Sequence, residues 1–572
     1  MSQKNFFSFL LKDAIVAKPG FNRWLVPPAS IGIHLCIGSV YAWSLFNMPL
    51  TNHYGVVAPA ASDWNLSEVL WIFSVAIVFL GLAAAFAGKW LEDVGPRMVG
   101  VVAATLWGGG FIIGSIGIQT HQLWLIYLGY GVFGGCGLGL GYVSPVSTLI
   151  RWFPDRRGMA TGMAIMGFGG GAMIAKPIKT SLLAYFATKP VYLGSESSIS
   201  TLTEQGRLFV EQAGEKIEVV VASAKQAALL PGGGEAGVYV VGSGNTGASA
   251  TFMTLGIIYF VVMIIAAFSY RVPAKDWKPE GWTPKSDSAK SMITKENVHI
   301  DQALKTPQFW QLWIMLCFNV TAGIGVIGVA KTMVNEIFGS NDVLAISTGL
   351  FAVLFFANYV VMLSAFNMVG RFIWASTSDY IGRKNTYHCF FILGALLYTS
   401  IPFFAMLGSA DQSTLIYFIG FCIATMIIFT MYGGGFATIP AYLADVFGTM
   451  HVGGIHGRLL TAWSTAGVLG PVIIGELRKV SLENAINDLV VQIEPNVFLE
   501  KFGAPVNQLD QLISAKTVTI ARLMEIVPEG TIDPTPSLYN TTMYCMATLL
   551  VIAFVANLFM SPVKEKHHYK GS

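Results

Sequence analysis

The chain has 572 residues, of which 54% are hydrophobic and only 12% are charged, and its mean hydropathy is +0.59. Soluble proteins carry about 25% charged residues, so this composition excludes an ordinary soluble protein and predicts an all-α integral membrane protein embedded in a lipid bilayer. The formal net charge of +3 is too small to indicate a nucleic-acid partner.

Apolar stretches long enough to cross a bilayer recur along the whole chain. A spanning helix needs about 20 mainly apolar residues, and twelve stretches meet this condition. The first six lie near 24–48, 67–88, 98–118, 122–148, 159–186 and 250–270, and the second six near 308–329, 345–375, 386–408, 413–437, 455–476 and 539–561. We therefore predict two six-helix halves, 24–270 and 308–561, joined by a central loop at 271–307.

Basic residues gather in alternate loops and in both tails, 1–23 and 562–572. The loops that follow helices 2, 4, 6, 8 and 10 hold Lys89 and Arg97; Arg151, Arg156 and Arg157; Arg271, Lys275, Lys278, Lys285, Lys290, Lys295 and Lys305; Arg383 and Lys384; and Arg458. Because Lys and Arg favour the cytoplasmic side, both termini are expected there. The N-terminal tail lacks the core and cleavage site of a signal peptide, and we expect a multi-pass protein of a bacterial cytoplasmic membrane.

Two long polar segments, 188–248 and 477–537, occupy equivalent positions in the two halves, after helices 5 and 11. Both would lie on the extracytoplasmic side. The first has mixed helix and strand character, and the second is predicted to be mostly helical. A similar short run occurs in each, Phe209–Gly214 and Phe498–Gly503. The segments are either a paired cap over the outer mouth or two unrelated additions.

A second internal repeat lies at two predicted cytoplasmic turns. Gly88–Arg97 follows helix 2 and Ala375–Lys384 follows helix 8, and both place an acid three residues before a glycine that a cation follows. Glycine permits a tight reversal between helices. We expect the charges at these turns to form a network that breaks and re-forms when the halves move. Its candidate members are Glu92, Arg97, Asp379 and Arg383.

Arg371 is the most informative residue, because it lies in an almost entirely apolar run with no acid before Asp379. A guanidinium stays charged in proteins, and an ionisable group inside a membrane usually marks an ion or substrate path. At 1.5 Å per residue it would lie roughly 12 Å inside the membrane from Asp379. A fixed cation there predicts an organic anion as substrate. Alternatively, Arg371 forms a structural ion pair or reaches toward the cytoplasmic surface.

The turns resemble the loop motif of the major facilitator superfamily, although Glu92 replaces the usual aspartate and Asp93 a usual cation. The membrane portion is similar to the oxalate/formate antiporter family within it, to which the monocarboxylate transporters are related. Four motifs carry this resemblance: Gly38–Phe46, Gly139–Gly158, Asn367-x-x-Gly370-Arg371 and Phe447-Gly448 after Pro440. Neither insert belongs to the family pattern.

The resemblance implies that Arg371, in its run with Asn367, binds the substrate carboxylate. A guanidinium can donate two parallel hydrogen bonds to a carboxylate. Oxalate-transporting members also have a lysine in the middle of helix 11, where this chain has Trp463. One cation would leave half of a dianion uncompensated, which favours a monoanion such as lactate, pyruvate, formate or acetate. Trp463 would then form an apolar wall against the short carbon tail of the substrate. Alternatively, it only packs against neighbouring helices or faces lipid.

Aromatic residues line the family's cavity, and the resemblance assigns that role here to Tyr41, Tyr142 and Tyr432, with Phe436 one turn from Tyr432 on the same face. Tyrosine hydroxyls can donate to a carboxylate while the rings pack on the carbon chain. Tyrosines in membrane proteins are also common as interfacial anchors, and this alternative stays open.

Coupling requires a titratable group or a counter-anion. His34, near the middle of helix 1, could exchange a proton within the physiological pH range, although a lone helical histidine is more often a packed residue. Lys176 and Lys331 lie near the outer ends of their helices, where they could attract anions or extend to the lipid headgroups.

No pattern typical of an enzyme, a cofactor site or a metal site occurs in the sequence. The leading hypothesis is a secondary transporter of a small monocarboxylate, with proton symport by alternating access. An oxalate/formate-type anion exchanger is the alternative. A carboxylate sensor that binds without transporting is a third hypothesis from another class.

Overall fold

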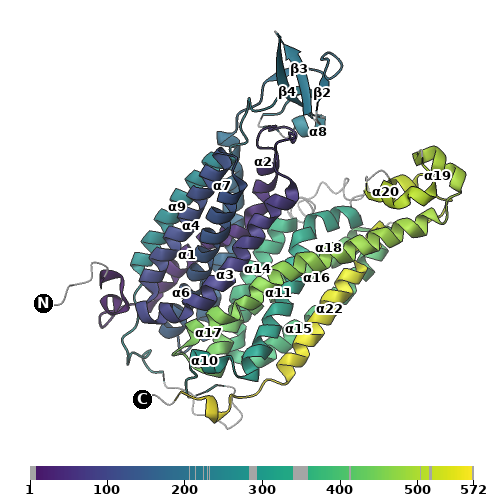
Figure 1. Ribbon diagram of the computed structural model, residues 1–572. Coiled ribbons are helices and arrows are strands. Elements are labelled where there is room, and N and C mark those ends of the chain that lie inside the picture. Colours follow the sequence, from purple (N-terminus) through teal and green to yellow (C-terminus); the bar gives the residue numbers. More distant parts are fainter. Residues whose placement is uncertain are drawn as a thin grey trace.

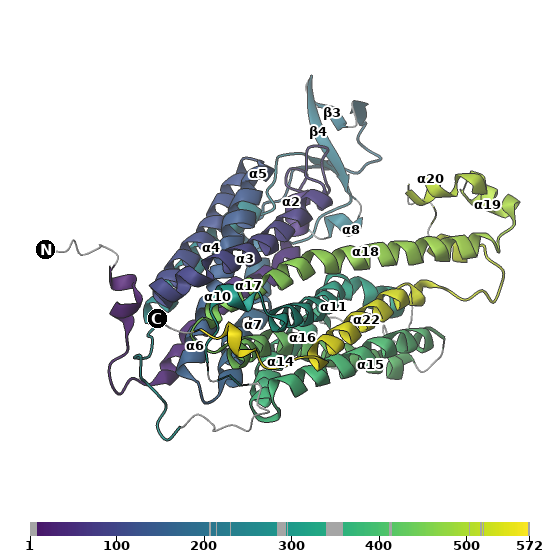
Figure 2. The ribbon, with the colours of Figure 1, turned by 60° about the horizontal axis from the view of Figure 1, so that its bottom comes forward.

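The computed structural model describes residues 8–204, 207–212, 214–222, 224–228, 230, 232–282, 293–294, 296–338, 359–410, 414–502, 504–514, 518 and 520–569. Long helices dominate it, and they form two bundles that correspond to the two halves of the chain (Figure 1). Both chain ends lie at one end of this double bundle, which we call the termini side, and the two inserts lie at the opposite end, the insert side (Figures 1 and 2).

The N-terminal half begins with one helical stretch that changes its type twice. α1 (Val26–Gly38) is followed by the 3₁₀ segment η4 (Ser39–Phe46) and then by α2 (Asn47–Thr51). The other helical elements of this half are α3 (Leu66–Val94), α4 (Pro96–Gln119), α5 (Leu123–Ile126), the π-helical η5 (Tyr127–Gly134), α6 (Gly135–Trp152), α7 (Arg157–Phe186) and α9 (Ala248–Ser269).

The C-terminal half is also a bundle of long helices. Its elements are α10 (Ile300–Ala303), α11 (Pro307–Phe338), α14 (Tyr359–Ile381), α15 (Arg383–Ala410), α16 (Thr414–Phe447), α17 (Val452–Leu459), α18 (Thr461–Val490) and α22 (Asn540–Leu558). Apolar side chains of both halves form one continuous core, which extends across the interface between the bundles.

Ten segments of the described residues are long and apolar enough to cross a membrane. α11 and α14 are two further long helices, of 32 and 23 residues, at the places predicted for helices 7 and 8. Part of the predicted helix 8, residues 345–358, lies outside the described residues. The largest boundary difference is at α18, which continues to Val490, well past the predicted end at 476.

Both predicted turns on the termini side have the conformation that only glycine adopts readily. Gly95 separates α3 from α4 with φ = 90°, and Gly382 separates α14 from α15 with φ = 86°. A side chain with a Cβ would be strained at these φ values. The repeat between the two halves is therefore visible in the backbone as well as in the sequence.

The first insert is built around an antiparallel sheet with strand order β1-β5-β4-β3-β2. The strands are β1 (Tyr192–Gly194), β2 (Leu202–Glu204), β3 (Arg207–Gln212), β4 (Glu215–Ala222) and β5 (Gly237–Val240), with the short α8 (Ala224–Ala227) between β4 and β5. Val220, Leu230 and Tyr239 pack against Val56 and Val57 of the loop between α2 and α3. The sheet is thus held by the N-terminal half.

The second insert is helical, as predicted, and it is carried by α18 and α22 of the C-terminal half. It contains α19 (Pro495–Phe502), η7 (Val506–Gln508), α20 (Leu509–Ser514) and α21 (Ile520–Met524). In both views it stands apart from the sheet (Figures 1 and 2). The similar runs of the two inserts fold differently, because Phe209 lies in β3 whereas Phe498 lies in α19. That sequence similarity therefore reflects no common structure.

Candidate functional site

Arg371 lies at the interface between the halves and is completely buried. Its Nε donates to Asn367 Oδ1, one turn earlier on α14, over 3.0 Å, and its Nη1 donates to the backbone carbonyl of Ile165 on α7 over 3.2 Å. No carboxylate of the described residues pairs with it. The guanidinium contacts neutral oxygens and the faces of two rings. Its Cζ lies 5.6 Å from the centroid of the Phe168 ring and 5.2 Å from that of the Phe436 ring.

Glycines let the helices approach closely enough for this arrangement. A Cβ added to Gly169 would lie 3.1 Å from Arg371 Nε, and one added to Gly433 would lie 2.2 Å from the carbonyl oxygen of Asn367. Any larger residue at position 433 would push α16 away from α14. These glycines therefore pack the helices together and also enclose the guanidinium.

The aromatic residues predicted for the cavity converge around Arg371. The ring of Trp463 on α18 lies 4.7 Å from Phe436, 5.3 Å from Tyr142 and 6.4 Å from Tyr41. Tyr432 packs on Phe436 at 5.3 Å, and its side chain also lies near that of Tyr41. The two halves therefore contribute jointly to one aromatic cluster, and Trp463 is fully buried rather than exposed at the surface of the bundle.

Phe168 belongs to this cluster but was missed in the sequence. Its ring lies between Tyr41 at 5.1 Å, Tyr142 at 5.5 Å and Trp463 at 5.3 Å. The signal was present, because Phe168 is the single aromatic residue inside the glycine run Gly167–Gly171. A large side chain kept in such a run indicates a contact that the neighbouring glycines make room for.

The buried hydrogen-bond donors of the cluster that have no partner among the described residues include Arg371 Nη2, the Tyr142 hydroxyl and Trp463 Nε1. Buried polar groups in proteins are nearly always hydrogen-bonded, and leaving one unbonded is costly. Donors without acceptors fit a ligand that brings acceptors of its own. A carboxylate, with two oxygens and about four lone-pair sites, is such a ligand.

A small cavity opens beside the guanidinium. Its volume is about 40 Å³, and it is lined by Tyr41, Gly169, Ile327, Leu363, Ser364, Asn367 and Phe429. At roughly 15 Å³ for each water, such a space holds only a few waters. The residues come from α11, α14 and α16 of one half and from η4 and α7 of the other. Relative movement of the halves would therefore change its size.

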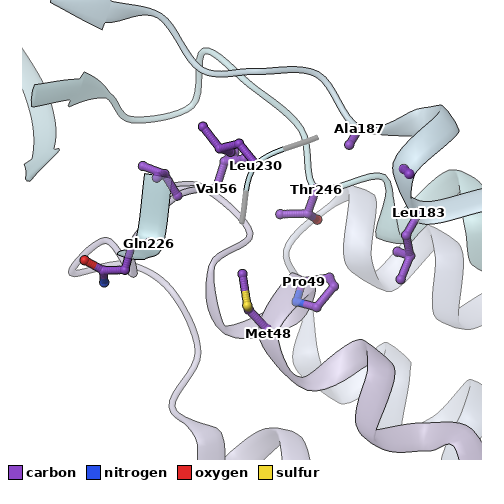
Figure 3. A pocket seen from close by; sticks show the side chains of 10 residues that line it. Met48, Pro49, Val56, Leu183, Ala187, Gln226, Leu230 and Thr246 are labelled. Atoms are coloured by element: carbon purple, nitrogen blue, oxygen red, sulfur yellow. The ribbon is translucent and has the colours of Figure 1, made fainter. Parts of the chain in front are cut away.

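A larger cavity of about 190 Å³ lies at the base of the sheet insert, where Met48 and Pro49 of α2 face Leu183 of α7 and Leu230 of the insert (Figure 3). Its walls are mostly apolar, and none of its lining residues is charged. A small organic anion would find no counter-charge there. The geometry thus favours the Arg371 region over this cavity as the anion site.

The halves are joined on the termini side by hydrogen bonds to charged groups. Asp379 of α14 accepts from the backbone N–H groups of Gly158, at 2.8 Å, and Met159, at 2.9 Å, in the first turn of α7. Asp379 also pairs with Arg383 at 2.6 Å. A carboxylate at a helix N-terminus is favoured by the unpaired N–H groups and the helix dipole. This contact links the two halves on the termini side.

Asp445 of α16, which the sequence analysis did not single out, extends this network. It pairs with Arg157 of the other half at 2.9 Å and with Arg383 at 3.1 Å. Glu92 makes a separate link across the halves, to His451 Nδ1 at 3.0 Å and to the Gly454 N–H at 3.2 Å.

Arg97, predicted to be part of the network, makes no ion pair among the described residues. It donates to the carbonyls of Phe9, Phe268 and Tyr270 at 3.0, 3.1 and 3.3 Å, which ties the N-terminal segment to the end of α9. These acceptors all belong to the N-terminal half, and a role of Arg97 in the network between the halves stays a prediction.

The other predicted cations and the histidine differ in their surroundings. His34 is buried, with its ring 5.3 Å from that of Tyr142 and without a hydrogen bond at either nitrogen. Lys176 is exposed on α7, whereas the side chain of Lys331 lies outside the described part of the structure. Two buried basic side chains were missed: Lys179 on α7, and His456 on α17, which lies 5.8 Å from Tyr142.

Within the described residues, no group of three or more His, Cys, Asp or Glu side chains could hold a metal ion. The charged side chain at the centre of the site is the Arg371 guanidinium. Around it, the described residues offer unbonded hydrogen-bond donors and aromatic walls.

Comparison with known proteins extends these observations. Residues 31–195 and 232–477 match the model of the Major Facilitator Superfamily. The chain is 24% identical to the oxalate:formate antiporter of Oxalobacter formigenes, over 78% of this chain and 83% of the relative. It is 22% identical to apicoplast pyruvate carrier 1 of Toxoplasma gondii, over 74% of this chain and 78% of that one. The second of these relatives is from a eukaryotic parasite.

Solved structures agree on the fold. The fucose transporter FucP in its outward conformation superposes with a TM-score of 0.51 at 13% identity, covering 94% of this chain and all of that one. A bacterial homologue of ferroportin in its outward-facing state gives 0.52 at 10% identity, covering 93% and 98%. The chain is therefore a multi-pass membrane protein that belongs to the Major Facilitator Superfamily, a family of secondary transporters and not of enzymes.

Proposed function

We propose that the protein transports a small monocarboxylate, such as formate, lactate, pyruvate or acetate, by alternating access around Arg371. The observation that carries the proposal is the guanidinium itself, completely buried between the halves, with Nη2 unbonded and no acid to neutralise it among the described residues. Burying an unpaired charge is costly, and a substrate carboxylate would supply the missing countercharge.

The shape of the site supports a carboxylate as the substrate group, as does the positive charge of Arg371. The site offers unbonded donors on Arg371, Tyr142 and Trp463, within walls of aromatic rings. A carboxylate accepts from the donors while its carbon tail packs on the rings. Two relatives are named for formate, oxalate or pyruvate, all of them small carboxylates, which agrees with this proposal.

A monoanion fits better than oxalate because the site has one cation among its described residues. Trp463 occupies the helix 11 position at which a second cation would balance a dianion, and its neighbours at that level are Tyr142, Phe168 and Phe436. Oxalate in this site would keep one charge uncompensated. Exchange of oxalate for formate remains the alternative function.

Proton symport is the proposed coupling mode, with His34 as the candidate proton carrier. Its ring lies against Tyr142, inside the cluster that would bind the substrate, and no side chain of the described residues is hydrogen-bonded to it. The proposed orientation puts both termini in the cytoplasm of a bacterial cell. The network at Asp379 would then be the cytoplasmic gate, closed in this structure.

Uptake into proteoliposomes tests the proposal directly. Labelled formate, lactate, pyruvate, acetate and oxalate are offered to the wild type, to Arg371→Lys and to the exposed-site control Lys176→Met, with and without an inward proton gradient. We expect flux of at least one monoacid, stimulated by the gradient, with Arg371→Lys slower by about 100-fold because it loses bidentate geometry.

The same assay separates the alternatives. Flux that depends on a counter-anion inside the vesicles and ignores the proton gradient would identify an exchanger. A folded protein that binds the acids without any flux would be a sensor. If Arg371→Lys transported at the wild-type rate, the assignment of Arg371 as the anion ligand would be wrong.

A further inference from the structure

Lys179 is completely buried near the insert-side end of α7, and it makes no ion pair within the described part of the chain. Its Nζ donates to the carbonyl oxygens of Ser39, at 2.8 Å, and Ala42, at 3.3 Å. The ammonium also lies 4.9 Å from the centroid of the Phe46 ring. All three contacts are to one element, the 3₁₀ segment η4 of the first helical stretch.

This segment is irregular where Lys179 touches it. α1 ends at Gly38, the next eight residues are 3₁₀-helical, and Ala42 has φ = −98° and ψ = 27°, outside the helical range. Carbonyls at a helix end carry the negative end of the dipole, and a cation near them is stabilising. A 3₁₀ run longer than about four residues is uncommon because its hydrogen-bond geometry is poor. An outside donor is therefore well placed to hold it.

The 3₁₀ geometry decides where Tyr41 points. In a 3₁₀-helix residues i and i+3 are eclipsed, so Tyr41 stands directly above Gly38. Gly38 is in backbone contact with α7, because a Cβ there would lie 2.2 Å from the carbonyl oxygen of Phe168. Tyr41 thus faces α7, where its ring meets Phe168 at 5.1 Å and its side chain lies near Arg371. An α-helical turn would rotate it about 60° away from this direction.

We propose that Lys179 is a positioning residue that clamps the η4 turn and so directs Tyr41 into the anion site. The proposal rests on the proposed transport function, since Tyr41 is assigned there to the substrate. Lys179 does not touch the substrate. Gly169, which abuts Arg371, lies ten residues earlier on α7, roughly 15 Å at 1.5 Å per residue.

Lys179 acts through backbone carbonyls, and its replacement should therefore weaken substrate binding without stopping the transport cycle. For Lys179→Met we expect KM for the transported monoacid to rise about tenfold, because roughly one charge-assisted hydrogen bond is lost. The maximal rate should stay within about twofold of the wild-type rate. Lys179→Arg, which keeps the charge and the donors, should restore part of the affinity. Lys176→Met, exposed and one turn away on the same helix, is the matched control.

A double-mutant cycle separates positioning from a general loss of structure. If Lys179 works only through Tyr41, the double variant Lys179→Met with Tyr41→Phe should have no higher KM than the worse of the two single variants. If the two substitutions instead raised KM independently, so that their fold-changes multiplied in the double variant, the proposal would be overturned. So would a KM for Lys179→Met equal to that of the Lys176→Met control.

Hydrogen–deuterium exchange gives a readout that needs no substrate. Peptides covering 39–46 should exchange faster in Lys179→Met than in the wild type or in Lys176→Met, whereas peptides from the middle of α4 should not change. Unchanged exchange over 39–46 would refute the clamp. If the wild type carried none of the acids tested, the proposed function would fail, and the exchange measurement would still decide on the clamp.

Discussion

The interface between the two halves has a polar region on the termini side and an aromatic region about 12 Å deeper, around Arg371. In the polar region, Asp379 and Asp445 both have charged or N–H partners on the opposite half. In the aromatic region, Arg371 has one carbonyl partner across the interface and an unbonded nitrogen. The carboxylates of the first region are paired across the interface, whereas the Arg371 guanidinium keeps an unbonded nitrogen, as the proposed gate and binding site would require.

This difference agrees with a transporter whose gate and binding site are separate parts of one interface. Charge-assisted hydrogen bonds are strong but must be broken for the termini side to open. Substrate binding can contribute to that change only through contacts that differ between the two conformations. Altering each region separately therefore tests the division.

The largest effect is expected from Asp379→Asn, which removes the charge that faces the first turn of α7. Each hydrogen bond to a charged group is worth about 1.5–3 kcal/mol. The ratio of closed to open molecules should therefore fall by about 10- to 100-fold. Spin labels at Arg156→Cys and Asn385→Cys, in a Cys389→Ala background, should report longer distances by double electron–electron resonance. The exposed Asp93→Asn is the control, and unchanged distances would mean that Asp379 does not hold the gate.

An intermediate effect is expected from Trp463→Lys, which gives the aromatic region a second cation. The ratio of oxalate to formate uptake should rise about tenfold, because a dianion then has one positive group for each carboxylate. Trp463→Met keeps an apolar side chain and should not change the ratio. If Trp463→Lys folded and the ratio stayed at the wild-type value, the charge count of the site would not set its preference.

The smallest effect is expected from removing the sheet insert, which packs on the N-terminal half away from Arg371. Thr188 and Asn245 pair at its base through backbone hydrogen bonds of 2.9 and 3.0 Å, so a short Gly-Ser linker can replace residues 191–243. Monoacid uptake should stay within about twofold of wild type. Loss of transport in a folded deletion variant would give the insert a role in the cycle.

The sequence predicted the helices more closely than the inserts. Apolar runs of bilayer length specify a helix locally, and most predicted segments lie within the observed helices. Phe209 and Phe498 show the limit of short matches, since similar runs became a strand and a helix. Strand formation in the first insert depends on pairing partners that a six-residue run does not contain.

For the candidate site, the sequence by itself determined Arg371, because a permanent charge inside an apolar run is unusual wherever the helix packs. The family resemblance added Tyr41, Tyr142, Tyr432 and Trp463. The packing of the helices was needed to show that Phe168 joins them and that Lys179 donates to a carbonyl of η4. It also showed Arg97 bound to carbonyls of the N-terminal half. Composition and run length act locally along the chain, whereas these contacts join helices far apart in sequence, and packing alone selects them.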